Sequence, residues 1–127
     1  MRGRVFLAII MLFLAISLCV LSFFVTKSIF EDVTNSVETT EQYILTNNTA
    51  KAKASADKLL ENWEVQQKIF SLFIEHSSLE RAELAIKSID KYLSIEDLSA
   101  SLIMCADAKI CIEQIYSAEM PSFWNIF

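Results

Sequence analysis

The sequence predicts an all-α protein in which one N-terminal transmembrane helix continues into a small extracytoplasmic helical bundle of three to four helices. Three observations support this fold class. The 127 residues include only one glycine and one proline, whereas sheets and tight turns need glycine for positive φ angles. Residues 5–25 form an uncharged apolar run. The rest of the chain repeats its apolar residues with the period of a helix.

The apolar run, "VFLAIIMLFLAISLCVLSFFV", is long enough to cross a membrane, since about 20 residues are needed. Two arginines precede the run, and Lys27 is the first charge after it. The positive-inside rule then places residues 1–4 in the cytoplasm, 5–25 in the cell membrane and 28–127 outside. We therefore expect a single-pass membrane protein.

A cleaved signal peptide is the alternative interpretation of the run. Such a peptide has an apolar region of about 7 to 15 residues and ends in a small-x-small site. "AIS" at Ala15–Ser17 resembles this site, but the apolar run continues beyond it to Val25. A lipoprotein signal would need a small residue before Cys19, and Leu18 is there. An uncleaved anchor is the better prediction.

Charge is divided sharply along the chain. Residues 1–27 carry three basic groups and no acidic ones, whereas residues 28–127 carry 8 basic and 16 acidic groups. An acidic outer domain argues against binding to nucleic acid and against docking on anionic lipid. The simplest role of this charge is solubility.

The first outer segment, residues 28–46, continues the apolar run without a helix breaker. Its apolar stripe is narrow, so we expect it to be only partly packed. The stripe consists of Ile29, Val33, Val37, Thr40 and Ile44.

The longest segment is predicted to be a helix over residues 50–76, capped by Asn48 or Thr49. Ile69 and Leu72 add apolar surface on a second side, which is typical of a helix with two neighbours. Its main apolar face consists of Ala52, Ala56, Leu59, Leu60, Trp63, Phe70 and Ile74.

A third helix is predicted to start at a capping box formed by Ser77 and Glu80, and a fourth at a second one formed by Ser94 and Asp97. The apolar face of the third helix consists of Leu79, Ala82, Ile86, Ile89 and Leu93.

The fourth helix, residues 95–119, is apolar nearly all round. This pattern favours central burial, and the alternative is an interface with a protein partner or a second copy of the chain. One side carries Leu98, Leu102, Cys105, Ile112 and Tyr116, and another carries Ile103 and Ile110.

Cysteine spacing indicates no disulfide within the fourth helix, because Cys105 and Cys111 lie about 240° apart around its axis. Both are interpreted as small apolar core residues. A disulfide between two chains is the alternative in an oxidising compartment.

The C-terminal tail, "PSFWNIF" at residues 121–127, begins with a proline that should end the fourth helix. Four large apolar residues then follow in five positions. A terminus of this composition is expected to dock, either near Trp63 and Phe70 or on a partner.

His76 is the one candidate for a metal or catalytic site, with Glu75 and Glu80 nearby in sequence. A zinc site needs three or four protein ligands, and one histidine without a nearby thiolate does not supply them. No nucleophile lies in a strained glycine-rich turn. We therefore predict no catalytic, cofactor-binding or metal-binding residues, and interpret the histidine as the last turn of the 50–76 helix, where positive charge is favourable.

One further pattern resembles a known family. A tryptophan, then "SLFIEH", a short acidic-apolar helix, an alanine-rich last helix and an "NIF" ending resemble the domain-of-unknown-function family 4363. The resemblance implies a small bacterial protein with one N-terminal span and a helical outer domain, and it implies no activity. Ser77 and Ser78 stand where that family usually has two acidic residues. The matching residues are Trp63, Phe73, His76, Asn125, Ile126 and Phe127.

These patterns favour a membrane-anchored structural or protein-interaction module on the outer face of a bacterial cell. A sensor-like ligand-binding bundle that acts through a membrane partner is the alternative. An enzyme is not expected, because no recognisable catalytic constellation is present in the sequence.

Overall fold

Four helices make up the structure, which is a computed structural model. It describes residues 1–72 and 74–126, with side chains described for 1–72 and 74–118. No strand occurs in those ranges, and the all-α prediction is confirmed. The helices are α1 (Arg2–Leu45), α2 (Thr49–Phe70), α3 (His76–Ser94) and α4 (Leu98–Ile126).

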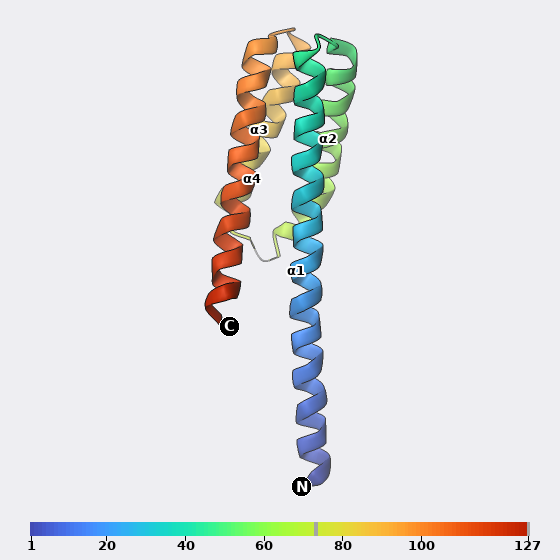
Figure 1. The fold of residues 1–127 in the computed structure, drawn as a ribbon, viewed down its shortest axis with the longest axis vertical. Helices are drawn as coiled ribbons and strands as arrows, with labels where there is room; N and C mark the ends of the chain where they lie inside the picture. Colours follow the sequence, from blue (N-terminus) through green and yellow to red (C-terminus); the bar gives the residue numbers. More distant parts are fainter. Residues whose placement is uncertain (73, 127) are drawn as a thin grey trace.

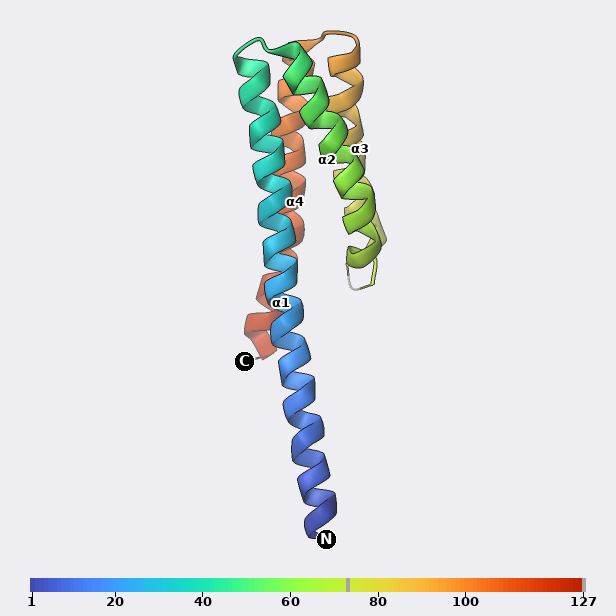
Figure 2. The same ribbon diagram turned by 90° about the vertical axis from the view of Figure 1, so that its right-hand side faces the viewer.

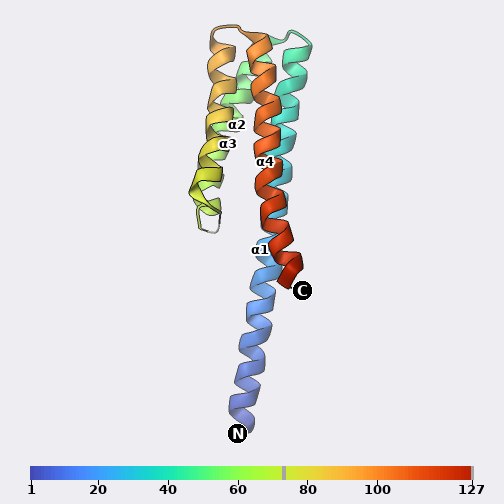
Figure 3. The ribbon, with the colours of Figure 1, turned by 90° about the vertical axis from the view of Figure 1, so that its left-hand side faces the viewer.

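The helices form an up-and-down bundle, and α1 extends far beyond the other three (Figure 1). Each helix packs against two neighbours: α1 contacts α2 and α4, and α3 contacts the same two helices. Over the described residues no Cα atoms of the diagonal pairs lie within 8 Å of each other, so the four helices close a ring around one core (Figures 2 and 3). Such a ring needs only short turns between antiparallel helices.

The apolar run and the first bundle helix are one continuous helix, as the absence of a breaker predicted. α1 is long and apolar enough to cross a membrane, with a mean hydropathy of 2.9 in its most apolar window. None of that window is buried within the chain. Length and composition are therefore compatible with a span, and equally with a signal sequence.

The outer half of α1 packs more fully than its narrow stripe suggested. Val33, Val37 and Ile44 are at most 2 % exposed, so the expectation of partial packing is wrong. The reason is the closed ring, in which α1 is covered by both α2 and α4. The sequence interpretation also omitted Phe30, which is buried and stacks on Phe70 with ring centroids 4.8 Å apart.

Thr40 holds a polar position inside this stripe. It is fully buried, its Oγ1 lies 2.7 Å from Oγ of Ser55 on α2, and it also donates to the carbonyl oxygen of Ser36. A buried hydrogen bond of this kind contributes about 1 kcal/mol, and it fixes how α1 and α2 are aligned.

α2 begins where expected and ends earlier. Asn48 caps it, because its Oδ1 accepts a hydrogen bond from the amide of Lys51. The helix ends at Phe70 instead of residue 76, and the following turn brings Ile74 back into the core through a 2.8 Å bond from its amide to the carbonyl of Phe70. Periodicity predicted one more helical turn here. The chain instead forms a tighter reversal, and this reversal buries Ile74.

The second apolar side expected on α2 is not a packing surface. Ile69 is 42 % exposed and Leu72 is 82 % exposed. α2 does have two neighbours, as expected, but the main face already serves both of them. That face is confirmed, with Ala52, Ala56, Leu59, Trp63 and Phe70 buried.

Neither predicted capping box forms. α3 starts at His76, with Glu75 in the cap position and no side-chain bond to the helix amides. Ser94 is the last residue of α3 and donates to the carbonyl of Asp90. Asp97 caps α4 alone by accepting from the amide of Ala100. Ser77 lies one residue after the start of α3, and Ser94 lies four residues before the start of α4, because the turns place the chain reversal elsewhere.

Two turns use left-handed backbone without glycine. Asn47, between α1 and α2, has a φ of 57°, and Glu96, between α3 and α4, has a φ of 58°. Short polar turns were expected from the scarcity of glycine, and the structure confirms them at the cost of strain at Glu96.

The predicted apolar face of α3 is confirmed, since Leu79, Ala82, Ile86, Ile89 and Leu93 are all buried.

The prediction that α4 is buried at the centre of the bundle is wrong. α4 packs on α3 and α1 and leaves Ile103 and Ile110 64 % and 53 % exposed, so it is not a central helix. A ring of four helices has no central member, and each keeps one side toward solvent.

α4 also differs in length from the predicted 95–119. It begins at Leu98 and continues through Pro121 to Ile126. Proline removes one helical hydrogen bond, but its fixed φ is itself helical, so the chain can continue with a bend. Figure 2 shows the last turns leaning away from the preceding axis. The predicted docking of the tail side chains lies outside the described residues, as does the Phe73 side chain.

Cys105 and Cys111 are buried and unpaired, which agrees with their interpretation as core residues. Burial raises the pKa of the Cys105 thiol to about 12 and also raises the pKa of Cys111. Both thiols are therefore protonated and shielded, and an interchain disulfide at either would require the bundle to open.

Candidate functional site: the groove between α1 and α4

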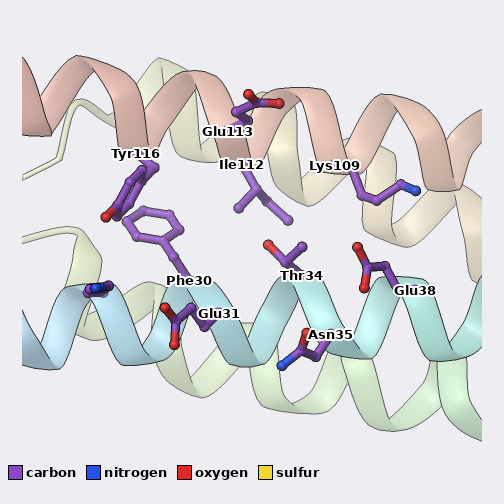
Figure 4. A pocket seen from close by; sticks show the side chains of 10 residues that line it. Phe30, Glu31, Thr34, Asn35, Glu38, Lys109, Ile112, Glu113 and Tyr116 are labelled. Atoms are coloured by element: carbon purple, nitrogen blue, oxygen red, sulfur yellow. The ribbon is translucent and has the colours of Figure 1, made fainter.

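A concave surface with an apolar floor lies between α1 and α4, just outside the apolar run (Figure 4). It is an open groove of about 490 Å³. The lining residues are Lys27, Phe30, Glu31, Thr34, Asn35, Glu38, Lys109, Ile112, Glu113 and Tyr116.

The floor of the groove is aromatic and aliphatic. The rings of Phe30 and Tyr116 meet edge to face with centroids 5.7 Å apart, and Ile112 beside them is buried. Phe30 also stacks on Phe70 of α2. Such a floor can bind a flat apolar group.

The rim of the groove is charged and mainly acidic. Three glutamates, Glu31, Glu38 and Glu113, and two lysines, Lys27 and Lys109, line it. Lys109 is already engaged, because its Nζ lies 2.7 Å from Oε2 of Glu41 on α1. This hydrogen bond to Glu41 is the main cause of the raised pKa of Lys109. The groove therefore favours a cation with an apolar body.

A second polar cluster ties α2 to α3. Lys53 Nζ lies 2.8 Å from Oδ1 of Asp57 in the same helix, and it also bonds Asp90 of α3. The lysine is 34 % exposed and Asp90 is 22 % exposed. This cluster is a structural crosslink between neighbouring helices, because one lysine bonds carboxylates of both α2 and α3.

His76 lies at the start of α3, so its expected position in the last turn of the preceding helix is wrong. Its side chain is 75 % exposed, and its Nε2 lies 2.9 Å from Oε1 of Glu80. Within the described residues, no group of three or more histidine, cysteine, aspartate or glutamate side chains is placed to hold a metal ion. Trp63, the other residue singled out in the same stretch, is fully buried core.

Two buried side-chain atoms of α2 lack a hydrogen-bond partner in the part of the chain that the structure describes. They are Nε1 of Trp63 and Oε1 of Gln66. An unpaired buried polar atom costs about 1 to 3 kcal/mol. The Trp63 ring compensates through its large buried area, including its contact with Phe70 at 6.0 Å.

Comparison with known protein families shows to which family this chain belongs. The sequence profile of the domain of unknown function DUF4363 matches residues 20–126. The chain belongs to the DUF4363 family. No curated protein and no solved structure matches it.

The DUF4363 match covers the whole bundle and begins inside the apolar run. The family relationship predicted from Trp63, His76 and the ending of the chain is therefore confirmed. The match indicates the extent of the domain, and it indicates no biochemical activity.

The groove of this DUF4363 chain was not predicted from sequence. Its α1 side was visible as polar residues spaced along one helical face, Glu31, Asn35 and Glu38. Nothing in the sequence showed that Ile112 and Tyr116 would lie opposite them, because that depends on the pairing of the first and last helices.

Proposed function

We propose that this DUF4363 chain is a membrane-anchored interaction module on the outer face of a bacterial cell. Residues 1–4 lie in the cytoplasm, 5–25 span the membrane and 28–127 form the outer bundle. The proposal gives the chain no enzymatic activity and no cofactor.

One observation carries the proposal: the apolar run and the first wall of the bundle are the same uninterrupted helix. Thr26 and Phe30, directly after the run, are already buried in the bundle. A helix shared in this way fixes the position and rotation of the bundle relative to the bilayer. A flexible linker would be sufficient if the anchor served only to retain the domain.

The contact surface that we propose is the exposed apolar stripe of α4, formed by Ile103, Ala106 and Ile110. The two isoleucines are 64 % and 53 % exposed and lie seven positions apart, the repeat of nearly parallel helix packing. The proposed partner is a second copy of the chain. Anchoring in one bilayer holds copies in the same orientation and raises their local concentration.

Topology is tested by cysteine labelling in intact cells that lack an outer membrane. Lys87 is replaced by cysteine, because its side chain is 52 % exposed. A membrane-impermeant maleimide should label Lys87→Cys before lysis, whereas the native buried cysteines should give little background. Labelling only after lysis would reverse the orientation, and recovery of the bundle in the medium would show a cleaved signal sequence.

Self-association is tested by crosslinking in membranes. Ile103→Cys should give a dimer-sized product with a short bismaleimide, whereas Leu84→Cys on α3 should not. Leu84 is a matched control, since it is 68 % exposed and apolar. Equal crosslinking of the two variants would reject the α4 stripe as the contact surface.

The second candidate is a sensor-like module that binds a ligand in the groove between α1 and α4. The observation in its favour is the aromatic floor beneath an acidic rim. The probe is 2-phenylethylamine, which joins an aromatic ring to a cation. It should raise the melting temperature of the chain, and the shift should disappear in Glu31→Gln/Glu113→Gln. A shift that survives in this variant, or no shift at all, would count against the groove.

A further inference from the structure

The end of the bundle nearest the apolar run carries apolar surface that the core does not use. Leu72, in the turn between α2 and α3, is 82 % exposed, more than any other described large apolar side chain except Met1. Val65 and Ile69 precede it on α2 and are 62 % and 42 % exposed.

Ring contacts show the level of this turn along α1. Phe30 stacks on Phe70, the last residue of α2, and also meets Tyr116 of α4. These three residues therefore lie at one height. The apolar run ends at Val25, about 8 Å below Phe30 along the helix. Leu72 follows Phe70 on the side toward the run, so the turn lies close to the outer end of the run.

The last turns of α4 reach further in the same direction. From Tyr116 to Ile126 the helix covers roughly 15 Å. Since α4 is antiparallel to α1, its final turn lies beside the last residues of the apolar run. All three ribbon views show α4 extending past the α2–α3 turn along α1 (Figures 1, 2 and 3). The sequence of this turn includes Phe123 and Trp124.

Charge at this end is mixed. Lys27 lies near Glu31 and Asp32 in the sequence of α1, and Lys68 in the last turn of α2 follows Glu64 by four residues. The turn from Ser71 to Glu75 has no basic residue, and α4 has no basic residue after Lys109. A bilayer contact here would depend on apolar side chains entering the headgroup region, which is typical of interfacial leucine and tryptophan.

We propose that this end of the bundle inserts into the outer surface of the bilayer that holds the apolar run, with Ile69 and Leu72 at the headgroups and the backbone of the last α4 turn level with the outermost acyl chains. The inference rests on the proposed anchor. The bundle then sits directly on the membrane, and its far end, with the turns around Asn47 and Glu96, points away from the membrane.

The test uses the full chain in vesicles of zwitterionic phosphatidylcholine, with Cys19 replaced by alanine. An environment-sensitive nitrobenzoxadiazole label is placed at Leu72→Cys, or at Ile95→Cys as the control. Ile95 is also apolar and 69 % exposed, but it lies in the turn at the far end of the bundle. A third variant, Leu14→Cys, reports on the apolar run itself.

The label at residue 72 should emit at shorter wavelength than the label at residue 95 and lose most of its fluorescence to lipids with a headgroup-level nitroxide. The label at residue 95 should be unaffected. Adding phosphatidylserine should leave the result unchanged.

A water-like, unquenched label at residue 72, together with a quenched label at residue 14, would overturn the proposal and leave the anchor intact. Quenching at residue 72 that requires phosphatidylserine would also overturn it, since it would show electrostatic attraction instead of apolar insertion. An unquenched label at residue 14 would show that the run does not span the bilayer, and the proposed function would fail with it.

Discussion

At the residue scale, Lys53 is the shared cation of two carboxylates from different helices. Its hydrogen bonds to Asp57 and then Asp90 raise the pKa of the lysine. Burial, followed by the contact with Asp57, raises the pKa of Asp90. The hydrogen bond with Asp90, and then that with Lys53, lowers the pKa of Asp57. The two carboxylates thus share one lysine. While both carboxylates are ionised, the charge of Lys53 offsets the repulsion between them.

Lys53→Met should lower the free energy of unfolding by about 1 kcal/mol at pH 7, the upper range for partly exposed pairs. Because the pKa of Lys53 is raised, the stability that its charge contributes is fully present below its usual pKa. That stability is lost at high pH only as pH rises through the raised value. The raised pKa of Asp90 means that it takes up a proton first as pH falls. A protonated Asp90 no longer forms an ion pair with Lys53. The difference in free energy of unfolding between variant and parent should therefore shrink as pH falls toward about 4.

Urea unfolding of the purified chain at several pH values measures this difference. Lys87→Met is the control, because the ion pair of Lys87 with Glu83 lies within one helix and Lys87 is 52 % exposed. It should lose only a few tenths of a kcal/mol. Equal losses in the two variants, or a loss at Lys53 that is the same at every pH, would contradict the shared-cation role.

At the element scale, the helix ends show how the chain reverses direction with almost no glycine. Asn47 adopts its left-handed φ at small cost, since asparagine tolerates this region. Glu96 follows the C-terminal end of α3, where helices usually have glycine. The glutamate gains no compensating side-chain bond among the described hydrogen bonds, so its strain is uncompensated.

Glu96→Gly should stabilise the bundle by about 0.5 to 1 kcal/mol. The gain is the relieved strain of about 1 to 2 kcal/mol, reduced by the greater flexibility of glycine in the unfolded chain. The control Glu61→Gly, at an exposed position inside α2, should lose about 1 kcal/mol because its backbone is helical. Thermal unfolding followed by circular dichroism measures both. If both substitutions destabilise the chain, the turn is not strained.

At the scale of the whole molecule, α1 combines two halves of different composition in one helix. Its first half is apolar on every side, and its second half is buried on one side only. The described core begins at Thr26, after the apolar run. Within the described residues the buried core therefore lies outside the apolar run, and we expect the bundle to fold without the run.

A fragment of residues 26–127 should fold into a helical domain with cooperative thermal unfolding. A fragment of residues 46–127 should not, because loss of the α1 wall exposes Trp63, Phe70 and the inner face of α4. Circular dichroism during heating compares the two. Cooperative melting of the shorter fragment at the same temperature would show that α1 is dispensable for the bundle.

The sequence alone determined the helical class, the apolar run and the main buried faces of α2 and α3. These features follow from composition and from a period of 3.6 residues, which are local properties of the chain. Trp63 as core and Asn48 as a cap were predictable for the same reason. The structure confirms both.

The tertiary structure alone decided where α2 ends, which apolar faces remain exposed and which side chains face each other across the groove. The end of α2 depends on whether Ile74 gains more by continuing the helix or by turning into the core, and only the assembled core decides this. Ile103 and Leu72 look like core residues by periodicity, but each helix of a closed ring has limited surface toward its two neighbours. The groove joins residues from the first and last helices, and their pairing depends on the rotation at which the ring closes, which no local pattern encodes.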